Sequence, residues 1–219
     1  PTSRKYLFFD LDGTLTDSMP GIARAVQYAL RRFGIDVQDL AALKPFLGPP
    51  LRDSFMEFYG MSPEEADRAV AVSREYFVPR GMFENELYPG IPELLQRLQQ
   101  AGFRMAIVSN KADPAVQLIR TLYFDGIIDV AVGESSACSK KPAPDMVLAA
   151  LQRLGSTADD AIYLGDSEVD LQTARNSGLP CATVGWGFRT EAELRAAGAQ
   201  TIYHSPEALG KALLNGSIQ

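Results

Sequence analysis

Histidine and cysteine are too scarce in this sequence for several common kinds of catalytic or metal site. It contains one histidine, His204, and two cysteines, Cys138 and Cys181. A single histidine excludes multi-histidine metal sites, and no motif surrounds His204 that would make it the base of a serine hydrolase. The cysteines have neither CxxC nor zinc-binding spacing, which indicates unpaired thiols in a reducing compartment.

Long apolar runs and an excess of positive charge are also missing. No apolar run reaches the roughly 18 residues that a membrane span requires. The first residues also lack the charged-then-apolar pattern of a targeting segment, so we expect a cytoplasmic protein that does not associate with membranes. The 21 lysines and arginines are outnumbered by 27 aspartates and glutamates, and the net charge of −6 argues against a nucleic-acid polymer as partner.

Two aspartates follow the first apolar segment of the chain. Residues 5–9 predict a strand that is buried on both faces, as in a parallel sheet. Asp10 and Asp12 come next on alternate residues, so their side chains can lie on one side of the chain. Two carboxylates that close together repel, and they require a bound cation, a shared proton or both. The alternative is an ordinary strand end with Asp-Gly turn chemistry.

Strands and helices alternate in the second part of the chain. Apolar segments predict strands at residues 103–108, 127–132, 161–164, 181–184 and 201–203, with amphipathic helices between them. This alternation is typical of βαβ units. We therefore predict an α/β fold with a Rossmann-like parallel sheet that is flanked by helices.

The segment between the first strand and Leu87 shows only helical patterns, including the capping box Ser62-Pro63-Glu64-Glu65. It spans about 70 residues, whereas an ordinary crossover needs only about a dozen. We therefore predict a catalytic core formed by residues 1–15 and 87–219, and an inserted helical cap domain, residues 16–86. Both connections leave the same sheet edge, so the cap is expected to cover Asp10 and Asp12.

Polar residues follow the later strands, and the carboxyl ends of parallel strands meet at one edge. Ser109 follows the strand at 103–108, and its hydroxyl and the next backbone amides can donate to a phosphate oxygen. Ser109-Asn110-Lys111 alone is equally compatible with a helix cap and a surface lysine. Lys141 directly precedes Pro142, which restricts its backbone and fixes its direction, so we favour it over Lys140 as a partner for Asp10.

A second acidic pair follows the strand at 161–164. Asp166 and Asp170 are four residues apart at a predicted helix start, and the helix dipole accounts for one negative charge there. It does not account for a second acidic cluster at the edge that already holds Asp10 and Asp12. Mg²⁺ does, because it prefers oxygen ligands and uses only a few protein carboxylates.

Four motifs now stand in order at four strand ends: Asp10-x-Asp12-Gly-Thr, Ser109-Asn110, Lys141-Pro142 and Gly165-Asp166-x-x-x-Asp170. Together they resemble the haloacid dehalogenase-like phosphatase superfamily over essentially the whole chain. The segments 46–51, 109–111 and 185–189 are similar to its phosphoglycolate phosphatase-like branch. The cap sequence is also similar to members of that branch described as 5′-nucleotidases.

The resemblance implies a phosphatase mechanism with Mg²⁺ as cofactor. Asp10 would attack phosphorus to give an aspartyl-phosphate. Asp12 would protonate the leaving oxygen and later accept a proton from water. The remaining implied roles are metal binding by Asp10, the carbonyl group of Asp12 and Asp166; phosphate binding by Ser109, the amide of Asn110, and Lys141; and support of the metal waters or Lys141 by Asp170.

The partner expected from this reading is a small-molecule phosphate ester. Lys44 and Arg52 in the cap are expected to face its leaving group, but they do not identify it. A 5′-nucleotidase and a sugar-phosphate mutase are alternatives, although Thr14 after Gly13 favours hydrolysis. A dehalogenase has no use for Asp12. A phospho-acceptor domain would be about half this length and have no cap, and a purely structural or binding role would require all four polar clusters to be coincidental. Either a monomer or a homodimer fits the sequence.

Overall fold

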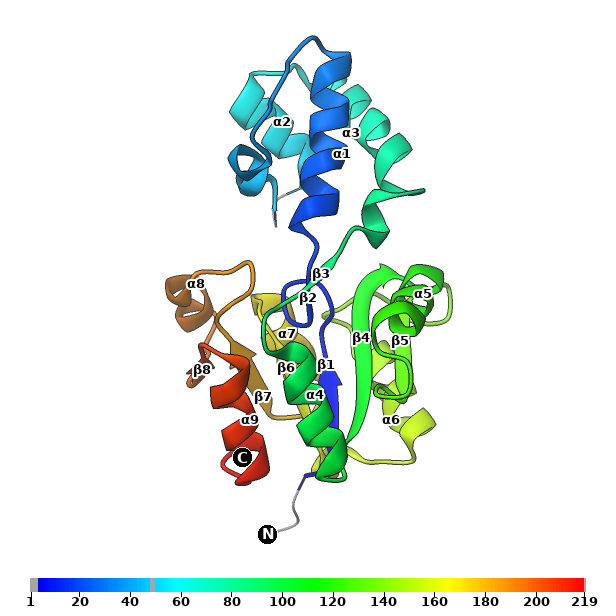
Figure 1. Ribbon diagram of the computed structural model, residues 1–219, viewed down its shortest axis with the longest axis vertical. Coiled ribbons are helices and arrows are strands. Elements are labelled where there is room, and N and C mark those ends of the chain that lie inside the picture. The colour runs from blue at the N-terminus through cyan, green and yellow to red at the C-terminus, as the bar shows by residue number, and fades with distance from the viewer. Residues whose placement is uncertain (1–3, 48–49, 219) are drawn as a thin grey trace. The chain divides into compact units, whose positions relative to one another are not determined.

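The computed structural model describes residues 4–47 and 50–218 (Figure 1). Contacts divide the chain into two compact units. We call Pro1–Thr16 with Leu87–Gln219 the core unit, and Asp17–Glu86 the helical unit. Within the described residues, no helix is both long and apolar enough to cross a membrane.

A parallel six-stranded sheet forms the centre of the core unit, in the order β5-β4-β1-β6-β7-β8. The strands are β1 (Tyr6–Phe9), β4 (Arg104–Ala112), β5 (Val130–Glu134), β6 (Ala161–Gly165), β7 (Cys181–Val184) and β8 (Ile202–Tyr203). The central strand, β1, pairs with β4 on one side and β6 on the other. The predicted α/β fold with a helical insertion is confirmed.

Helices connect these strands and cover the sheet (Figure 1). They are α4 (Ile91–Gln100), α5 (Asp113–Tyr123), α6 (Asp145–Leu154), α7 (Glu168–Ser177), α8 (Glu191–Ala196) and α9 (Pro206–Leu214), with a short 3-10 turn, η3 (Ala158–Asp160). Met146 and Val147 of α6 belong to the same buried cluster as Phe8 of β1 and Tyr163 of β6. Leu7 and Phe8 point to opposite faces of the sheet and are both fully buried, so β1, which leads directly to Asp10, is covered on both faces.

Two of the predicted strands had wrong boundaries. The β4 strand continues to Ala112 instead of ending at residue 108, with a shift in its pairing to β5 between Ser109 and Ala112. The β5 strand begins at Val130 rather than at residue 127. In both places the hydrogen bonds to the neighbouring strand set the boundary. The pattern of apolar residues in the sequence predicts only which residues are buried.

The helical unit has its own apolar core. Its elements are α1 (Met19–Arg32), η1 (Leu40–Phe46), α2 (Leu51–Tyr59), α3 (Pro63–Phe77) and η2 (Gly81–Phe83). The predicted Ser62–Glu65 capping box is present at the start of α3. Buried side chains such as Leu30 and Phe55 form the core. At the unit boundary, β2 (Thr16–Asp17) and β3 (Glu86–Leu87) pair as a two-stranded sheet that the sequence analysis did not predict, because two residues are too few to show a periodic pattern.

Candidate active site

Asp10 stands at the carboxyl end of the central strand. Its backbone N–H donates to the carbonyl group of Leu164 at 2.8 Å, so the position of the residue is still fixed by the sheet. The chain then turns through Gly13, whose φ of +93° favours glycine, and Gly13 N–H donates to the carbonyl group of Thr16 at 2.8 Å. The tight turn leaves the Asp10 carboxylate buried beside the ends of β4 and β6.

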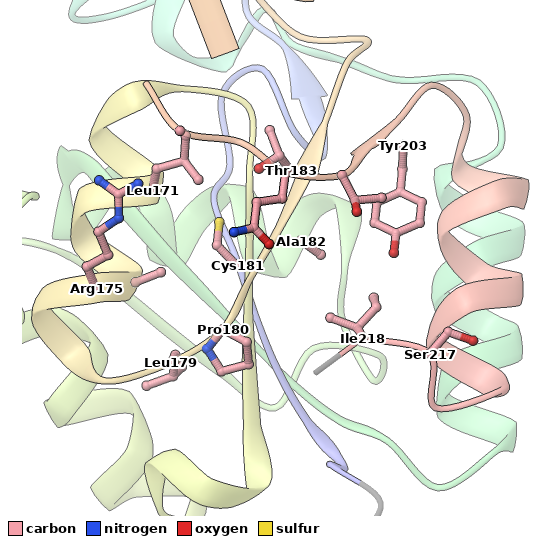
Figure 2. A pocket seen from close by; sticks show the side chains of 14 residues that line it. Leu171, Arg175, Leu179, Pro180, Cys181, Ala182, Thr183, Tyr203, Ser217 and Ile218 are labelled. Carbon is pink, nitrogen blue, oxygen red and sulfur yellow. The ribbon is translucent and has the colours of Figure 1, made fainter. Parts of the chain in front are cut away.

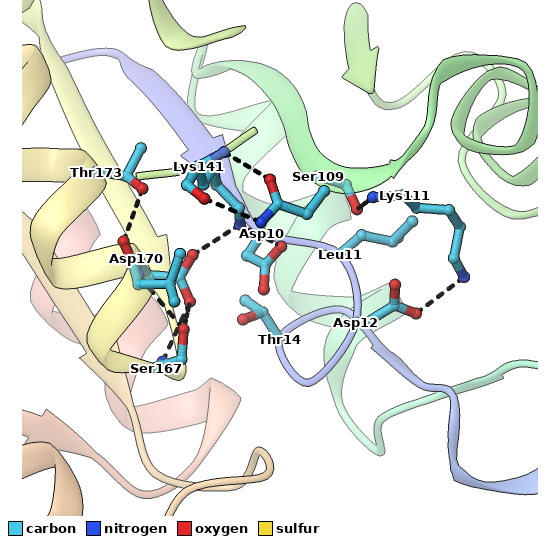
Figure 3. A network of polar contacts seen from close by, with 12 residues as sticks. Asp10, Leu11, Asp12, Thr14, Ser109, Lys111, Lys141, Ser167, Asp170 and Thr173 are labelled. Carbon is cyan, nitrogen blue, oxygen red and sulfur yellow. Dashed lines mark hydrogen bonds and ion pairs between the residues drawn. The ribbon is translucent and has the colours of Figure 1, made fainter. Parts of the chain in front are cut away.

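Lys141 binds the Asp10 carboxylate. Its Nζ lies 2.7 Å from Asp10 Oδ1, 2.8 Å from Asp170 Oδ1 and 3.1 Å from Tyr163 Oη (Figure 3). Its side chain is 4% exposed. An ammonium group has three N–H donors, and these three contacts use all of them. Burial opposes the charged form of Lys141, but the charges of Asp10 and Asp170 outweigh burial and hold its pKa well above the usual value.

Asn110 fixes the backbone of Lys141. Its Oδ1 accepts from Lys141 N–H at 2.6 Å, and its Nδ2 donates to the carbonyl group of Lys141 at 3.2 Å. The sequence analysis assigned phosphate binding to the backbone amide of Asn110 and did not foresee this role for its side chain. Ser109 is buried at the neighbouring position, where its Oγ accepts from the backbone N–H of Lys111 at 3.1 Å.

Asp170 is held by several donors at the start of α7. Its Oδ1 accepts from Lys141 and, at 3.0 Å, from Tyr163 Oη. Its Oδ2 accepts from Ser167 Oγ at 2.6 Å and from the backbone N–H groups of Ser167 and Asp166 at 3.1 and 3.2 Å. Both carboxylate oxygens are therefore occupied by protein donors, and this arrangement suits a supporting role.

Asp166 presents a second buried carboxylate toward Asp10. Thr14 Oγ1 donates to its Oδ1 at 3.2 Å, and the backbone N–H of Phe188 donates to its Oδ2 at 2.9 Å. Burial, followed by the charge of Asp170, raises the pKa of Asp166 to about 6. A Cβ atom at Gly187 would clash with the Asp166 side chain and with the backbone carbonyl group of Gly13, so only glycine fits beside this carboxylate.

Asp10, Asp166 and Asp170 form a candidate metal centre. One carboxylate oxygen from each residue lies within 4.8 Å of the other two, although both oxygens of Asp170 already accept from protein donors. Burial, followed by the charge of Asp170, raises the pKa of Asp10 well above its usual value. Lys141 supplies one positive charge for three carboxylates, so the donor set fits a hard divalent cation. The carboxylate of Asp12 is not part of this cluster.

Asp12 pairs instead with Lys111. Lys111 Nζ lies 3.1 Å from Asp12 Oδ1, with the two side chains 10% and 26% exposed (Figure 3). The alternative reading of Lys111 as a solvated surface charge was therefore wrong. Its place directly after Ser109-Asn110 was the feature that could have identified it.

Further residues near the site were missed because they act from neighbouring segments. Tyr163 lies inside β6, and its hydroxyl group bridges Lys141 and Asp170. Trp186 follows β7, and its Nε1 donates to the carbonyl group of Thr14 at 2.9 Å. Trp186 belongs to the segment 185–189 that contributed to the family resemblance, whereas no feature of the sequence indicated Tyr163.

The predicted cap residues lie in the helical unit. Lys44 is exposed on η1, and Arg52 Nε on α2 donates to Asp67 Oδ1 at 2.7 Å. Gly48 and Pro49, which lie between Lys44 and Arg52 in the sequence, are outside the described residues. A role of Lys44 and Arg52 in substrate binding stays a prediction.

A cavity of about 410 Å³ lies elsewhere in the core unit, beside β7 and β8 (Figure 2). None of the predicted site residues lines it. Burial, followed by the charge of Asp170, raises the pKa of the Cys181 thiol in its wall to about 12. The thiol therefore stays protonated and is a poor nucleophile.

Comparison with known proteins agrees with this geometry. The model of the haloacid dehalogenase-like hydrolase family matches residues 7–184. The chain belongs to this family. It is 39% identical to a 5′-nucleotidase of Pseudomonas aeruginosa, over 87% of this chain and 86% of that protein. It is 38% identical to a phosphoglycolate phosphatase of Rhodobacter capsulatus, over 84% and 85%. The crystal structure of a predicted phosphatase from Clostridium acetobutylicum is 39% identical and superposes with a TM-score of 0.76, over 97% of this chain and 99% of that one.

Proposed function

We propose that this chain is a Mg²⁺-dependent phosphomonoesterase that hydrolyses a small phosphorylated metabolite through an aspartyl-phosphate on Asp10. The observation that carries the proposal is the position of the Asp10 carboxylate. It lies at the end of the central strand, 2.7 Å from a buried lysine and within the three-carboxylate cluster. Few purely structural roles call for so much charge at one buried point, and perturbed buried charges are typical of catalytic sites.

Asp10 is the nucleophile in this proposal. Lys141 holds Asp10 Oδ1 and thereby orients the other oxygen for in-line attack on phosphorus. As the new O–P bond forms, the ester P–O bond breaks and Asp12 donates its proton to the leaving oxygen. Asp12 then accepts a proton from the water that attacks the aspartyl-phosphate, and phosphate leaves while the Asp10 carboxylate is regenerated.

Phosphate binding falls to the other residues of the four motifs. Ser109 Oγ and the backbone amide of Asn110, in the second half of β4, would donate to phosphoryl oxygens, whereas the backbone N–H of Lys111 already donates to Ser109 Oγ. Mg²⁺ held by Asp10, Asp166 and the carbonyl group of Asp12 would neutralise negative charge on the phosphoryl group. Asp170 keeps Lys141 in place and is not itself required as a ligand.

Two substrate classes follow from the relatives. The Rhodobacter capsulatus relative favours phosphoglycolate, and the Pseudomonas aeruginosa relative favours a nucleoside monophosphate. These substrates share the phosphomonoester and differ in the leaving group, so the four motifs serve either of them. The leaving-group contacts must therefore decide between them.

Metal removal tests the proposal directly. Hydrolysis of p-nitrophenyl phosphate is expected to disappear in excess chelator and to return with Mg²⁺. Ca²⁺ is expected to inhibit, because its longer and looser coordination would misplace Asp10. Full activity in excess chelator would contradict the metal assignment. A panel of phosphomonoesters measured under the same conditions would rank the substrate classes.

A further inference from the structure

Lys111 is a largely buried cation to which the proposed mechanism assigns no role. Its side chain is 10% exposed, and its Nζ contacts Asp12 Oδ1 at 3.1 Å. This is the one ion pair that Lys111 makes among the described residues. The contact uses one of the three N–H donors of the ammonium group, whereas Lys141 has all three engaged. Lys111 therefore has donors to offer to a ligand.

The sheet fixes where Lys111 points. It lies within β4, and its backbone N–H donates to Ser109 Oγ at 3.1 Å. Adjacent side chains in an extended strand diverge. Asn110 accordingly reaches Lys141 while Lys111 reaches Asp12. In Figure 3, Asp10 lies between the Lys141–Asp170 contact and the Lys111–Asp12 pair, so one lysine stands on each side of the nucleophile.

Asp12 places the leaving group next to Lys111. A general acid must come within about 2.6–3.2 Å of the oxygen that it protonates. Lys111 and the leaving oxygen would each form a hydrogen bond with the carboxyl group of Asp12. The ammonium group of Lys111 would therefore lie roughly 4–6 Å from the leaving oxygen. A charged group on the carbon next to the leaving oxygen comes within reach of that ammonium.

We propose that Lys111 selects substrates whose leaving group carries a negative charge beside the leaving oxygen, the class of 2-hydroxycarboxylates esterified with phosphate. This inference rests on the proposed function, because the role of Asp12 defines where the leaving group lies. Asp12 cannot both carry the proton for the leaving oxygen and serve as the counter-charge of Lys111. A largely buried ammonium without an anion is costly, and a leaving-group carboxylate supplies the anion. A nucleoside leaving group has no charge at that position.

A matched pair of substrates tests the inference. The ratio of kcat/KM for 2-phosphoglycolate to kcat/KM for 2-hydroxyethyl phosphate compares a carboxylate with a neutral CH₂OH group at the same position. We expect this ratio to be at least about 10 for the wild-type protein, and Lys111→Met to lower it about 10- to 100-fold, the usual effect of losing a charged hydrogen bond. Lys111→Arg keeps the charge and should retain most of the ratio. Lys140→Met is the control, because Lys140 is 61% exposed and pairs with Glu134 at 3.4 Å.

The outcomes separate this inference from the proposed function. If Lys111→Met lowers kcat/KM equally for both esters, Lys111 acts only through Asp12 and the inference is wrong. A wild-type ratio of 1 or less overturns it as well, even while p-nitrophenyl phosphate is hydrolysed with Mg²⁺. If no phosphomonoester, including p-nitrophenyl phosphate, is hydrolysed with Mg²⁺, both the proposed function and this inference are wrong. The unfolding temperatures of both Met variants show whether either has lost its fold.

Discussion

In the part of the chain that the structure describes, the core unit buries charged side chains and the helical unit does not. Among the described residues, the buried charged side chains are Asp10, Lys141, Asp166 and Asp170, all in the core unit. The polar side chains buried in the helical unit are uncharged: Ser18, Ser54, Ser73 and Asn85. Its ion pairs among the described residues, Arg24–Glu84, Arg31–Asp36 and Arg52–Asp67, have arginine side chains that are 46%, 53% and 43% exposed. The helical unit is thus stabilised mainly by apolar packing, whereas the core unit accepts the free-energy cost of burying charged side chains.

That cost indicates where the chemistry takes place. Three carboxylates share one buried ammonium, and burial raises the pKa values of Asp10 and Asp166. A structural site would replace such groups with apolar ones at little loss, because buried ion clusters contribute little to stability. Substitutions in the core unit should therefore alter activity strongly, and those in the helical unit should alter only substrate preference.

Asp10→Asn should have the largest effect. It removes the nucleophile while preserving shape, so kcat for p-nitrophenyl phosphate should fall by a factor on the order of 10⁴–10⁶. Quenched reactions analysed by mass spectrometry should show a phosphorylated wild-type protein and no phosphorylated variant. Phosphoenzyme that persisted in the variant would place the nucleophile on another residue.

Asp166→Asn should abolish Mg²⁺-dependent activity and yet stabilise the metal-free protein. An asparagine can accept from Phe188 N–H through Oδ1 and donate to Thr14 Oγ1 through Nδ2, so both hydrogen bonds of Asp166 survive. The variant also relieves the repulsion from Asp170. Because the pKa of Asp166 is raised from 3.8 to about 6, the gain in the free energy of unfolding at pH 7.5 should be roughly 2–3 kcal/mol.

The pH dependence of that gain is a control. A carboxyl group with a raised folded-state pKa binds its proton more tightly in the folded protein. Its contribution to stability is therefore complete below pH 3.8 and is lost as the pH rises through about 6. Metal-free wild type should lose this stability across that window, and Asp166→Asn should not. Urea unfolding at pH 5 and pH 7.5, with and without Mg²⁺, measures it; an equal difference at both pH values would contradict the assignment.

The sequence predicted the elements of the site better than their mutual contacts. Asp10, Asp166 and Asp170 follow strands, and the rule that parallel strands end at one edge was enough to bring them together. The side-chain bond from Asn110 to the backbone of Lys141 depends on the continuation of β4 past residue 108, which only strand pairing defines. Tyr163 was not predicted because its apolar ring is typical of a core position, and its hydroxyl partner comes from α7.

Tyr163→Phe should have a moderate effect. It removes one of the three partners of Lys141 Nζ and a donor to Asp170 Oδ1, while the ring can keep its packing. We expect kcat to fall about 3- to 30-fold, in line with the loss of hydrogen bonds to charged groups. Tyr203→Phe on β8 is the matched control, with no change in kcat expected. Equal effects of the two variants would show that Tyr163 serves packing alone.

Arg52→Ala in the helical unit should have the smallest effect on chemistry. Arg52 and Asp67 form an exposed pair, and such pairs contribute little to stability. Hydrolysis of p-nitrophenyl phosphate should stay within about twofold of wild type, because its good leaving group needs little assistance. If Arg52 or Lys44 binds the leaving group as the sequence predicts, Ala at either position should raise KM for the physiological ester.

Asp67→Ala separates substrate binding from the surface ion pair. It removes the partner of Arg52 and keeps the guanidinium group. A KM that rises in Arg52→Ala but not in Asp67→Ala would assign Arg52 to the substrate, because both variants lose the same ion pair. Equal changes in KM would show that the effect comes from the loss of the Arg52–Asp67 ion pair and not from a contact with the substrate. If Arg52→Ala instead lowered kcat for both esters by the same large factor, the helical unit would take part in the catalytic step, and the contrast between a chemical core unit and a selective helical unit would be wrong.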